Sequence, residues 1–71
     1  MAEKIEAEIV ANVLKVVAHE GQTLHEGDTV VLLESMKMEI PVVTETSGVL
    51  TKIAVKEGDV VQEHDLIAVV E

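Results

Sequence analysis

The sequence has no cysteine, no aromatic residue and no arginine. Without cysteine, neither a disulfide nor a thiolate metal site can support the fold, and a reducing compartment imposes no cost. Without aromatic side chains, the core must be built from valine, isoleucine, leucine, alanine and methionine. A core so rich in β-branched residues favours strands.

Positive charge is also scarce, because five lysines face 14 acidic residues and give a net charge of −9. Such a surface repels phosphate groups, so we expect neither nucleic acid nor a membrane as a partner. No apolar run approaches the roughly 20 residues of a membrane helix, and the first ten residues lack the regions of a signal peptide. The 71 residues predict one domain, 1–71, that is cytoplasmic and monomeric.

An internal repeat is present at an offset of 37 residues. KVVAHEGQTLHEGDTVVLLE (15–34) aligns without a gap with KIAVKEGDVVQEHDLIAVVE (52–71), and six of the 20 positions are identical. Apolar character is also conserved between the two copies, as at Val30 and Ile67. The repeat predicts two similar halves related by a pseudo-twofold axis.

Each half is predicted to contain a strand, a glycine turn, a short strand, an aspartate-containing turn and a final strand. We expect strands at Leu14–His19 and Lys52–Lys56, which Gly21 and Gly58 follow at positions that need positive φ. The final strands are Thr29–Glu34 and Leu66–Glu71, and alternation over Ile5–Ile9 suggests a first strand. The predicted fold is all-β, with two antiparallel sheets packed face to face as a flattened sandwich or barrel.

The segment that joins the halves, residues 35–47, allows two interpretations. Good helix formers and the spacing of Val30, Leu33, Lys37 and Ile40 would suit a short helix. Pro41 disfavours that helix, and the strand character of the aligned second copy favours a hairpin. We therefore predict a hairpin with Met36-Lys37 at its tip and Met38–Thr44 as its returning strand, with Pro41 at a sheet edge.

The predicted tip lacks the residues that a tight hairpin turn prefers. Two-residue turns need positive φ and usually contain glycine, asparagine or aspartate, so Met36-Lys37 suggests that function overrides local preference. The 37-residue offset also pairs Lys37 with positions just before Met1 and just after Glu71. The pseudo-twofold axis therefore predicts that the lysine and the chain ends lie at opposite poles.

The pentapeptide Glu34-Ser35-Met36-Lys37-Met38 resembles the Glu-(Ala/Ser)-Met-Lys-Met signature of biotinyl domains, the biotin carboxyl carrier modules of biotin-dependent carboxylases. The resemblance extends over nearly the whole chain, including the Ser47-Gly48 and Glu57-Gly58-Asp59 turns. It implies the flattened β-barrel, or barrel-sandwich hybrid, that biotinyl domains share with lipoyl domains. Because the chain begins with Met just before the first strand and ends where the repeat ends, we expect a stand-alone carrier of the biotin/lipoyl attachment type, with an excised domain that carries an added Met as the alternative.

The resemblance also implies the chemistry. Lys37 would be the covalent attachment site for biotin, a swinging arm added after translation by a biotin protein ligase that supplies biotinyl-AMP. The carried biotin would accept carboxyl at a biotin carboxylase subunit and deliver it at a carboxyltransferase subunit. Glu34, Ser35, Met36, Met38 and Glu39 would form the recognition motif, since methionine suits contact with several partners and the glutamates could contact a basic ligase surface.

Three other functions remain open from the residues alone. A lipoyl carrier has the same fold, although lipoyl domains typically show Asp-Lys-Ala at the tip. An interaction module that is never modified would function with Lys37 replaced by arginine. A small enzyme would turn over without a partner, but neither Glu34 nor Glu39 is arranged as an evident base for Lys37 and no pocket is expected, so we predict a protein that is not an enzyme.

The three histidines do not predict a metal site. His19, His25 and His64 lie on turn-like segments, and no two have the spacing of paired metal ligands. The acidic residues show no calcium-loop pattern either. We therefore expect no metal. The resemblance implies biotin as the cofactor.

Overall fold

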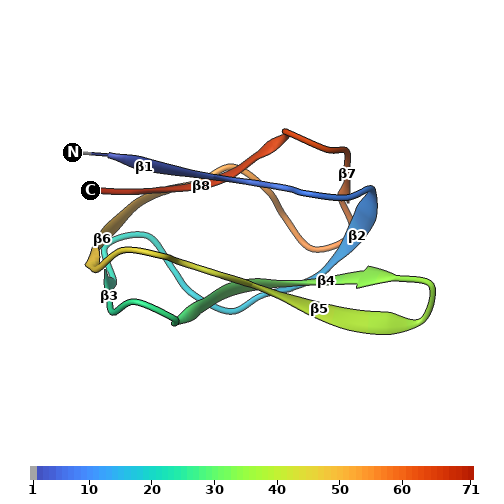
Figure 1. Ribbon diagram of the computed structural model, residues 1–71, viewed down its shortest axis with the longest axis horizontal. Coiled ribbons are helices and arrows are strands. Elements are labelled where there is room, and N and C mark those ends of the chain that lie inside the picture. Colours follow the sequence, from blue (N-terminus) through green and yellow to red (C-terminus); the bar gives the residue numbers. More distant parts are fainter. Residues whose placement is uncertain (1) are drawn as a thin grey trace.

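The computed structural model describes residues 2–71, which form two four-stranded antiparallel sheets (Figure 1). The strand order is β1-β8-β6-β3 in one sheet and β5-β4-β2-β7 in the other. The strands are β1 (Glu3–Glu6), β2 (Ala11–Val16), β3 (Thr23–Leu24), β4 (Thr29–Ser35), β5 (Met38–Val43), β6 (Gly48–Ile53), β7 (Val60–Val61) and β8 (Leu66–Val70). No helix in this part of the chain is long and apolar enough to cross a membrane.

The 37-residue repeat is also a structural repeat. It carries β2 onto β6 and β3 onto β7 residue for residue, and it overlays β1 on β5 and β8 on β4. Applied to the order β1-β8-β6-β3, the same correspondence gives β5-β4-β2-β7, which is the order of the other sheet. The predicted pseudo-twofold relation and the two antiparallel sheets are therefore confirmed.

The core lies between the sheets and draws its side chains from both halves. Repeat-related positions are buried together, and the almost fully enclosed pairs include Val13/Leu50, Leu24/Val61, Val30/Ile67, Val31/Ala68 and Leu33/Val70. Burial of one aliphatic side chain stabilises a fold by about 1.5–3 kcal/mol. A single cluster of such residues therefore joins the two halves, and neither sheet has a separate core.

The turns are equivalent in the two halves. Gly21 and Gly58 have φ of 91° and 89°, which confirms the predicted need for positive φ. The aspartate turns are fixed by side chains, because Asp28 Oδ2 accepts a hydrogen bond from the His25 amide at 2.8 Å and Asp65 Oδ2 accepts one from the Gln62 amide at 2.9 Å.

The predicted boundaries of three strands were wrong. The runs Leu14–His19 and Lys52–Lys56 lie too far along the chain, since the strands are Ala11–Val16 and Gly48–Ile53, and the first strand ends at Glu6. The misleading residues are apolar but lie after the strands. Ala18 and Val55 are buried beneath the following loops, where they extend the core without belonging to a sheet.

The joining segment forms a hairpin, so the helical alternative was wrong. Strand β4 pairs with β5 on one side and with β2 on the other, and this central position suits its nearly continuous apolar run. Strand β5 is an edge strand, which tolerates the missing amide of Pro41 as predicted.

Candidate functional site

The β4–β5 hairpin ends in a two-residue turn. Ser35 pairs with Met38, and the two residues between them, Met36 and Lys37, have φ of 54° and 65°. Two consecutive residues of positive φ define a type I′ turn, whose twist matches that of the flanking strands. Because neither residue is glycine, asparagine or aspartate, the backbone adopts this turn against local preference, at a cost of about 1–2 kcal/mol per residue.

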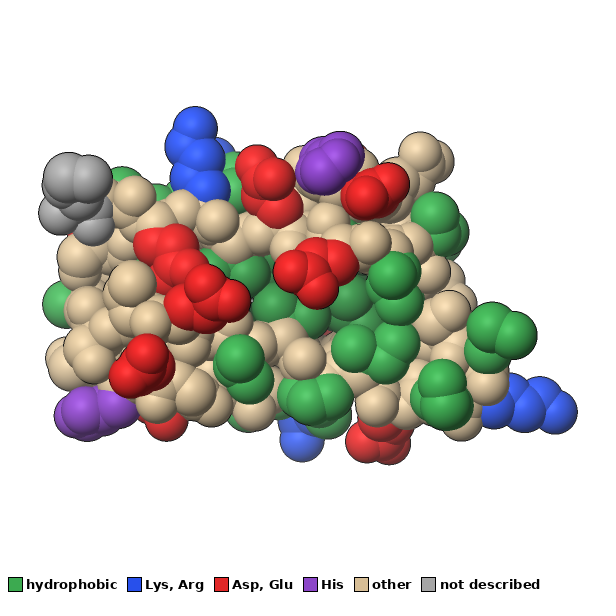
Figure 2. Space-filling view, in the orientation of Figure 1, with side chains coloured by type: hydrophobic (Ala, Val, Ile, Leu, Met, Phe, Trp, Pro, Cys, Tyr) green, Lys and Arg blue, Asp and Glu red, His purple; other side chains and the backbone are tan. Residues whose placement is uncertain are grey.

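The turn directs its side chains into solvent. Met36 is 89% exposed, Met38 is 61% exposed and Lys37 is exposed as well. Both methionines therefore lie outside the core. In Figure 2, hydrophobic side chains gather on the part of the visible face that lies toward the hairpin end, and acidic side chains gather toward the other end. An exposed amine between two exposed thioethers is an accessible point of attachment.

The remaining residues of the predicted motif flank this turn. Glu34 on β4 lies directly opposite Glu39 on β5, and Ser35 is half-buried at the end of β4. Like charges in directly opposed positions repel and destabilise a strand pair. The structure thus brings all six predicted site residues together on one hairpin end, with two carboxylates behind the lysine.

The hairpin presents the lysine from a fixed base. Leu33 and Val31 of β4 point into the core and are 1% and 0% exposed. The turn lies at one end of a molecule 32 Å long, and both termini lie at the other end (Figure 1), as the repeat predicts. Motion of a group attached to Lys37 would therefore come from the lysine side chain while the strands stay in place.

The surroundings of Lys37 contain no catalytic arrangement among the residues that the structure describes. The larger groove of the molecule, with a volume of about 710 Å³, has Leu33 and Ile40 in its lining but no residue from 34 to 39. The histidines lie elsewhere: His25 and His64 contact carboxylates at 3.8–3.9 Å, and residues 2–71 contain no group of three potential metal ligands. This geometry can display a group attached to Lys37.

Sequence reasoning missed one feature near the site. This feature is a groove between β1 and β5, each of which is an edge strand of its sheet. Its lining residues fall within three separate stretches of the chain, 3–9, 33–45 and 63–64, so no local motif reports it. The only local signal was the run of glutamates among apolar residues over positions 3–9.

Comparisons with known proteins agree with this geometry. The biotin/lipoyl family model, described as "Biotin-requiring enzyme", matches residues 2–70. The chain is 57% identical over 70 residues to the "Biotinylated protein TB7.3 homolog" of Mycobacterium leprae, covering 99% of both chains. It is 40% identical over 63 residues to the "Biotin/lipoyl attachment protein" of Bacillus subtilis, covering 89% of this chain and 86% of that one.

A solved structure shows the same fold within a longer chain. Urea carboxylase of Kluyveromyces lactis matches with a TM-score of 0.94 and 38% identity. The match covers 100% of this chain and 6% of the carboxylase chain, so the two share one small region of that protein.

Proposed function

Because this chain belongs to the biotin/lipoyl family and is a biotin carrier without catalytic activity of its own, we propose that Lys37 is the residue that carries the biotin. The observation that supports this assignment is the type I′ turn that holds Lys37 exposed at the end of the molecule, between Met36 and Met38. We also infer that residues 1–71 form one domain, since one core cluster joins both sheets.

Attachment requires an activated carboxyl group from another protein. The amine of Lys37 would attack the carboxyl carbon of biotinyl-AMP, forming an amide and releasing AMP, and a base of the ligase would take the proton. The modification removes one positive charge, so the net charge of −9 becomes −10. When bound, the cofactor supplies a carboxyl-accepting ureido group, and the chain itself contributes exposure, reach and tethering at high effective concentration.

Recognition of the hairpin would use the residues around the lysine. Met36 and Met38 offer flexible, polarisable contacts, and the opposed pair Glu34–Glu39 offers a local negative charge to a basic ligase surface. Ser35, half-buried at the end of β4, would set the position at which the turn begins.

Biotin-dependent carboxylases are the proposed class of partner, with a biotin protein ligase and carboxylase and carboxyltransferase subunits as the specific partners. The fold match within urea carboxylase supports that class. The proposal also includes a monomer in the cytoplasm. Mutual repulsion between chains of charge −9 supports the monomeric state, and the absence of cysteine is compatible with a reducing compartment.

Intact-mass measurement tests the site directly. The chain is incubated with a biotin protein ligase, biotin and ATP, beside Lys37→Arg and beside a parallel reaction with a lipoate ligase and lipoate. Lys52→Arg is the matched control, because Lys52 is an exposed lysine on β6 outside the hairpin. We expect one biotinyl increment in the wild type and in Lys52→Arg, and none in Lys37→Arg.

Two results would contradict the proposal. An increment that persists in Lys37→Arg would place biotin on another lysine. An increment with lipoate and none with biotin would make the chain a lipoyl carrier.

A further inference from the structure

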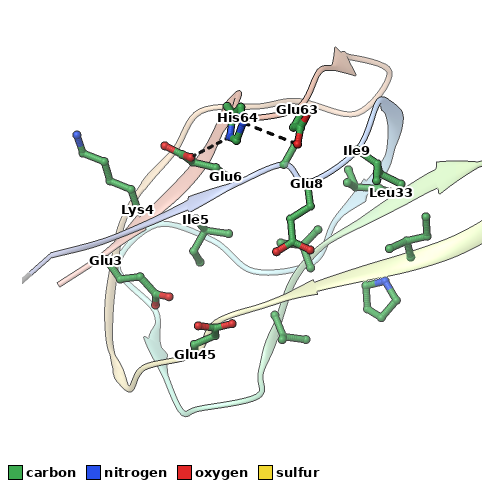
Figure 3. A pocket seen from close by; sticks show the side chains of 15 residues that line it. Glu3, Lys4, Ile5, Glu6, Glu8, Ile9, Leu33, Glu45, Glu63 and His64 are labelled. Carbon is green, nitrogen blue, oxygen red and sulfur yellow. Dashed lines mark ion pairs between the residues drawn. The ribbon is translucent and has the colours of Figure 1, made fainter.

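A groove runs between the two sheets where their edge strands do not pair with each other. Strand β1 ends one sheet and β5 ends the other, and the space between them has a volume of about 710 Å³ (Figure 3). Its lining includes apolar side chains that reach solvent, among them Ile9 and Val43, each 40% exposed, and the half-buried Val42. Water in contact with these side chains is released when an apolar side chain covers them, which favours binding.

One end of the groove is closed by a contact between the sheets. Glu3 Oε1 accepts hydrogen bonds from Thr46 Oγ1 at 2.8 Å and from Thr44 Oγ1 at 3.2 Å. Thr44 is fully buried, and its hydroxyl also bonds the Thr46 backbone. This contact ties β1 to the turn after β5 at one end of the groove.

The groove carries negative charge that the rest of the described chain does not neutralise. In Figure 3 the side chains of Glu8 and Glu45 point into the space between β1 and β5, and that of Lys4 points away from it. Among residues 2–71, no lysine lies within ion-pairing distance of a carboxylate, and neither Glu8 nor Glu45 makes a side-chain hydrogen bond. These carboxylates are therefore available to cations from outside.

The borders of the groove suit an extended segment. Strand β1 pairs only with β8, so its other edge presents unpaired backbone amides and carbonyls to the groove. Strand β5 is also an edge, but Pro41 removes one of its donors, which makes β1 the better template for an added strand. Addition of a strand to a free edge is a common mode of peptide recognition.

From these features we infer that the groove binds an extended segment of a partner protein in which apolar residues alternate with lysine or arginine. The segment adds to the free edge of β1, its apolar side chains cover Ile9, Val42 and Val43, and its cations meet Glu8 and Glu45. A second copy of this chain is a poor occupant, because each copy has a charge of −9 and would bring more carboxylates to the same place.

The groove reaches the base of the hairpin. Its lining includes Leu33 of β4 and Ile40 of β5, and Ile40 is three residues after Lys37. A partner bound there would be anchored beside the attachment site without contacting residues 34–39. The inference does not depend on biotin, since the groove consists of residues outside the hairpin turn.

The test uses the full chain labelled with ¹⁵N and the peptide Lys-Val-Lys-Val-Lys-Val, blocked at both ends. Two control peptides separate the contributions: Lys-Gly-Lys-Gly-Lys-Gly retains the charge alone, and Glu-Val-Glu-Val-Glu-Val reverses it. Two further peptides carry methyl groups on alternate backbone nitrogens, one peptide at its odd-numbered residues and the other at its even-numbered residues. An added strand pairs with the free edge through only one of these two sets of amides, so only one set of methyl groups should block binding. Amide chemical shifts locate the site, and titration gives Kd.

The charge contribution is measured with Glu8→Gln/Glu45→Gln. The matched control is Glu26→Gln/Glu57→Gln, which removes two exposed carboxylates outside the groove and leaves the same net charge. We expect the groove variant to raise Kd about five- to tenfold and the control less than twofold, because charge-assisted contacts in a partly desolvated groove exceed exposed pairs. We expect one N-methylated peptide to lose binding and the other to retain it.

Several results would overturn the inference. Shifts spread over the acidic surface, or equal losses in both double variants, would indicate general charge attraction. Equal binding of the two N-methylated peptides would exclude strand addition, and no binding of the Lys-Val peptide would exclude the occupant. The titration is repeated with Lys37→Arg and with biotinylated protein. Binding that is unchanged in both shows that the groove works independently of Lys37, whatever the outcome of the biotinylation test.

Discussion

Gly27 and His64 occupy the same position in the two halves of the chain, and both have a left-handed backbone. Their φ values are 92° and 77°, and each immediately precedes the aspartate that fixes the turn, Asp28 or Asp65. Glycine adopts this conformation without steric cost, whereas a residue with a Cβ does not. The second half therefore contains a strained turn that the first half avoids.

Replacing His64 with glycine should stabilise the fold. The change removes a left-handed strain of about 1–2 kcal/mol and adds part of the backbone entropy cost of glycine, so we expect a net gain of about 0.5–1 kcal/mol. The contacts of His64 with Glu6 and Glu63, at 3.9 and 3.8 Å, are exposed and contribute little. Urea denaturation measures the change. Gly27→Ala, the converse substitution, should destabilise by about 1–2 kcal/mol, and a loss of stability in His64→Gly would contradict the strain argument.

The hairpin tip should show opposite effects on stability and on modification. Met36→Asn/Lys37→Gly introduces the pair that a type I′ turn prefers, and we expect about 1–2 kcal/mol more stability and no biotin acceptance. Met36→Asn alone retains Lys37 and should give part of the gain with slower biotinylation. Denaturation and intact mass check the two effects. An unchanged midpoint in the double variant would mean that the turn is not strained.

Reversing one charge of the Glu34–Glu39 pair should separate stability from recognition. Glu39→Lys converts a repulsive cross-strand pair into an attractive one, which should stabilise the hairpin by roughly 0.2–1 kcal/mol. The same change should slow biotinylation by the ligase several-fold if the pair is recognised. Glu57→Lys, with an equal change in net charge far from the hairpin, controls for general attraction. Equal rates for the two variants would exclude Glu39 from recognition.

Leu50 should be among the most sensitive positions of the core. It is fully buried, and Leu50→Ala should cost about 2.7–5 kcal/mol, a large part of the stability expected for a domain of this size. Leu14→Ala is the comparison, because Leu14 is 39% exposed. Thermal melting followed by circular dichroism checks both. A comparable loss in Leu14→Ala would indicate that the exposed leucine supports the fold through contacts that burial alone does not reveal.

The sequence predicted the repeat, the two sheets and the hairpin because each has a periodic or local signal. Gly21 and Gly58 mark equivalent turns, and Pro41 marks an edge. Strand boundaries were less predictable, since strands begin at Ala11 and Gly48, which are poor strand formers, and apolar residues continue into the loops. Gly48 has a tertiary role instead: a methyl group there would lie 2.5 Å from the Glu71 carbonyl oxygen.

The residues around Lys37 were easier to predict from the sequence than the groove was. Lys37 and its neighbours are contiguous, so one short motif locates them all. A two-residue turn at Met36-Lys37 fixes the register of the hairpin, and that register places Glu34 opposite Glu39. The groove lies between two edge strands, β1 and β5, that occupy equivalent positions in the two halves, and no property of either strand alone indicates it.

The pairing of Glu3 with Val70 has a practical consequence for engineering. It places the first and last strands side by side at the pole opposite the lysine, so a short linker could join them into a second hairpin related to the first by the pseudo-twofold axis. A circularised chain with a grafted Ser-Met-Lys-Met tip in that linker would have two equivalent working ends. Joining the first and last strands in this way would convert the pole opposite Lys37 into a second site for displaying a lysine.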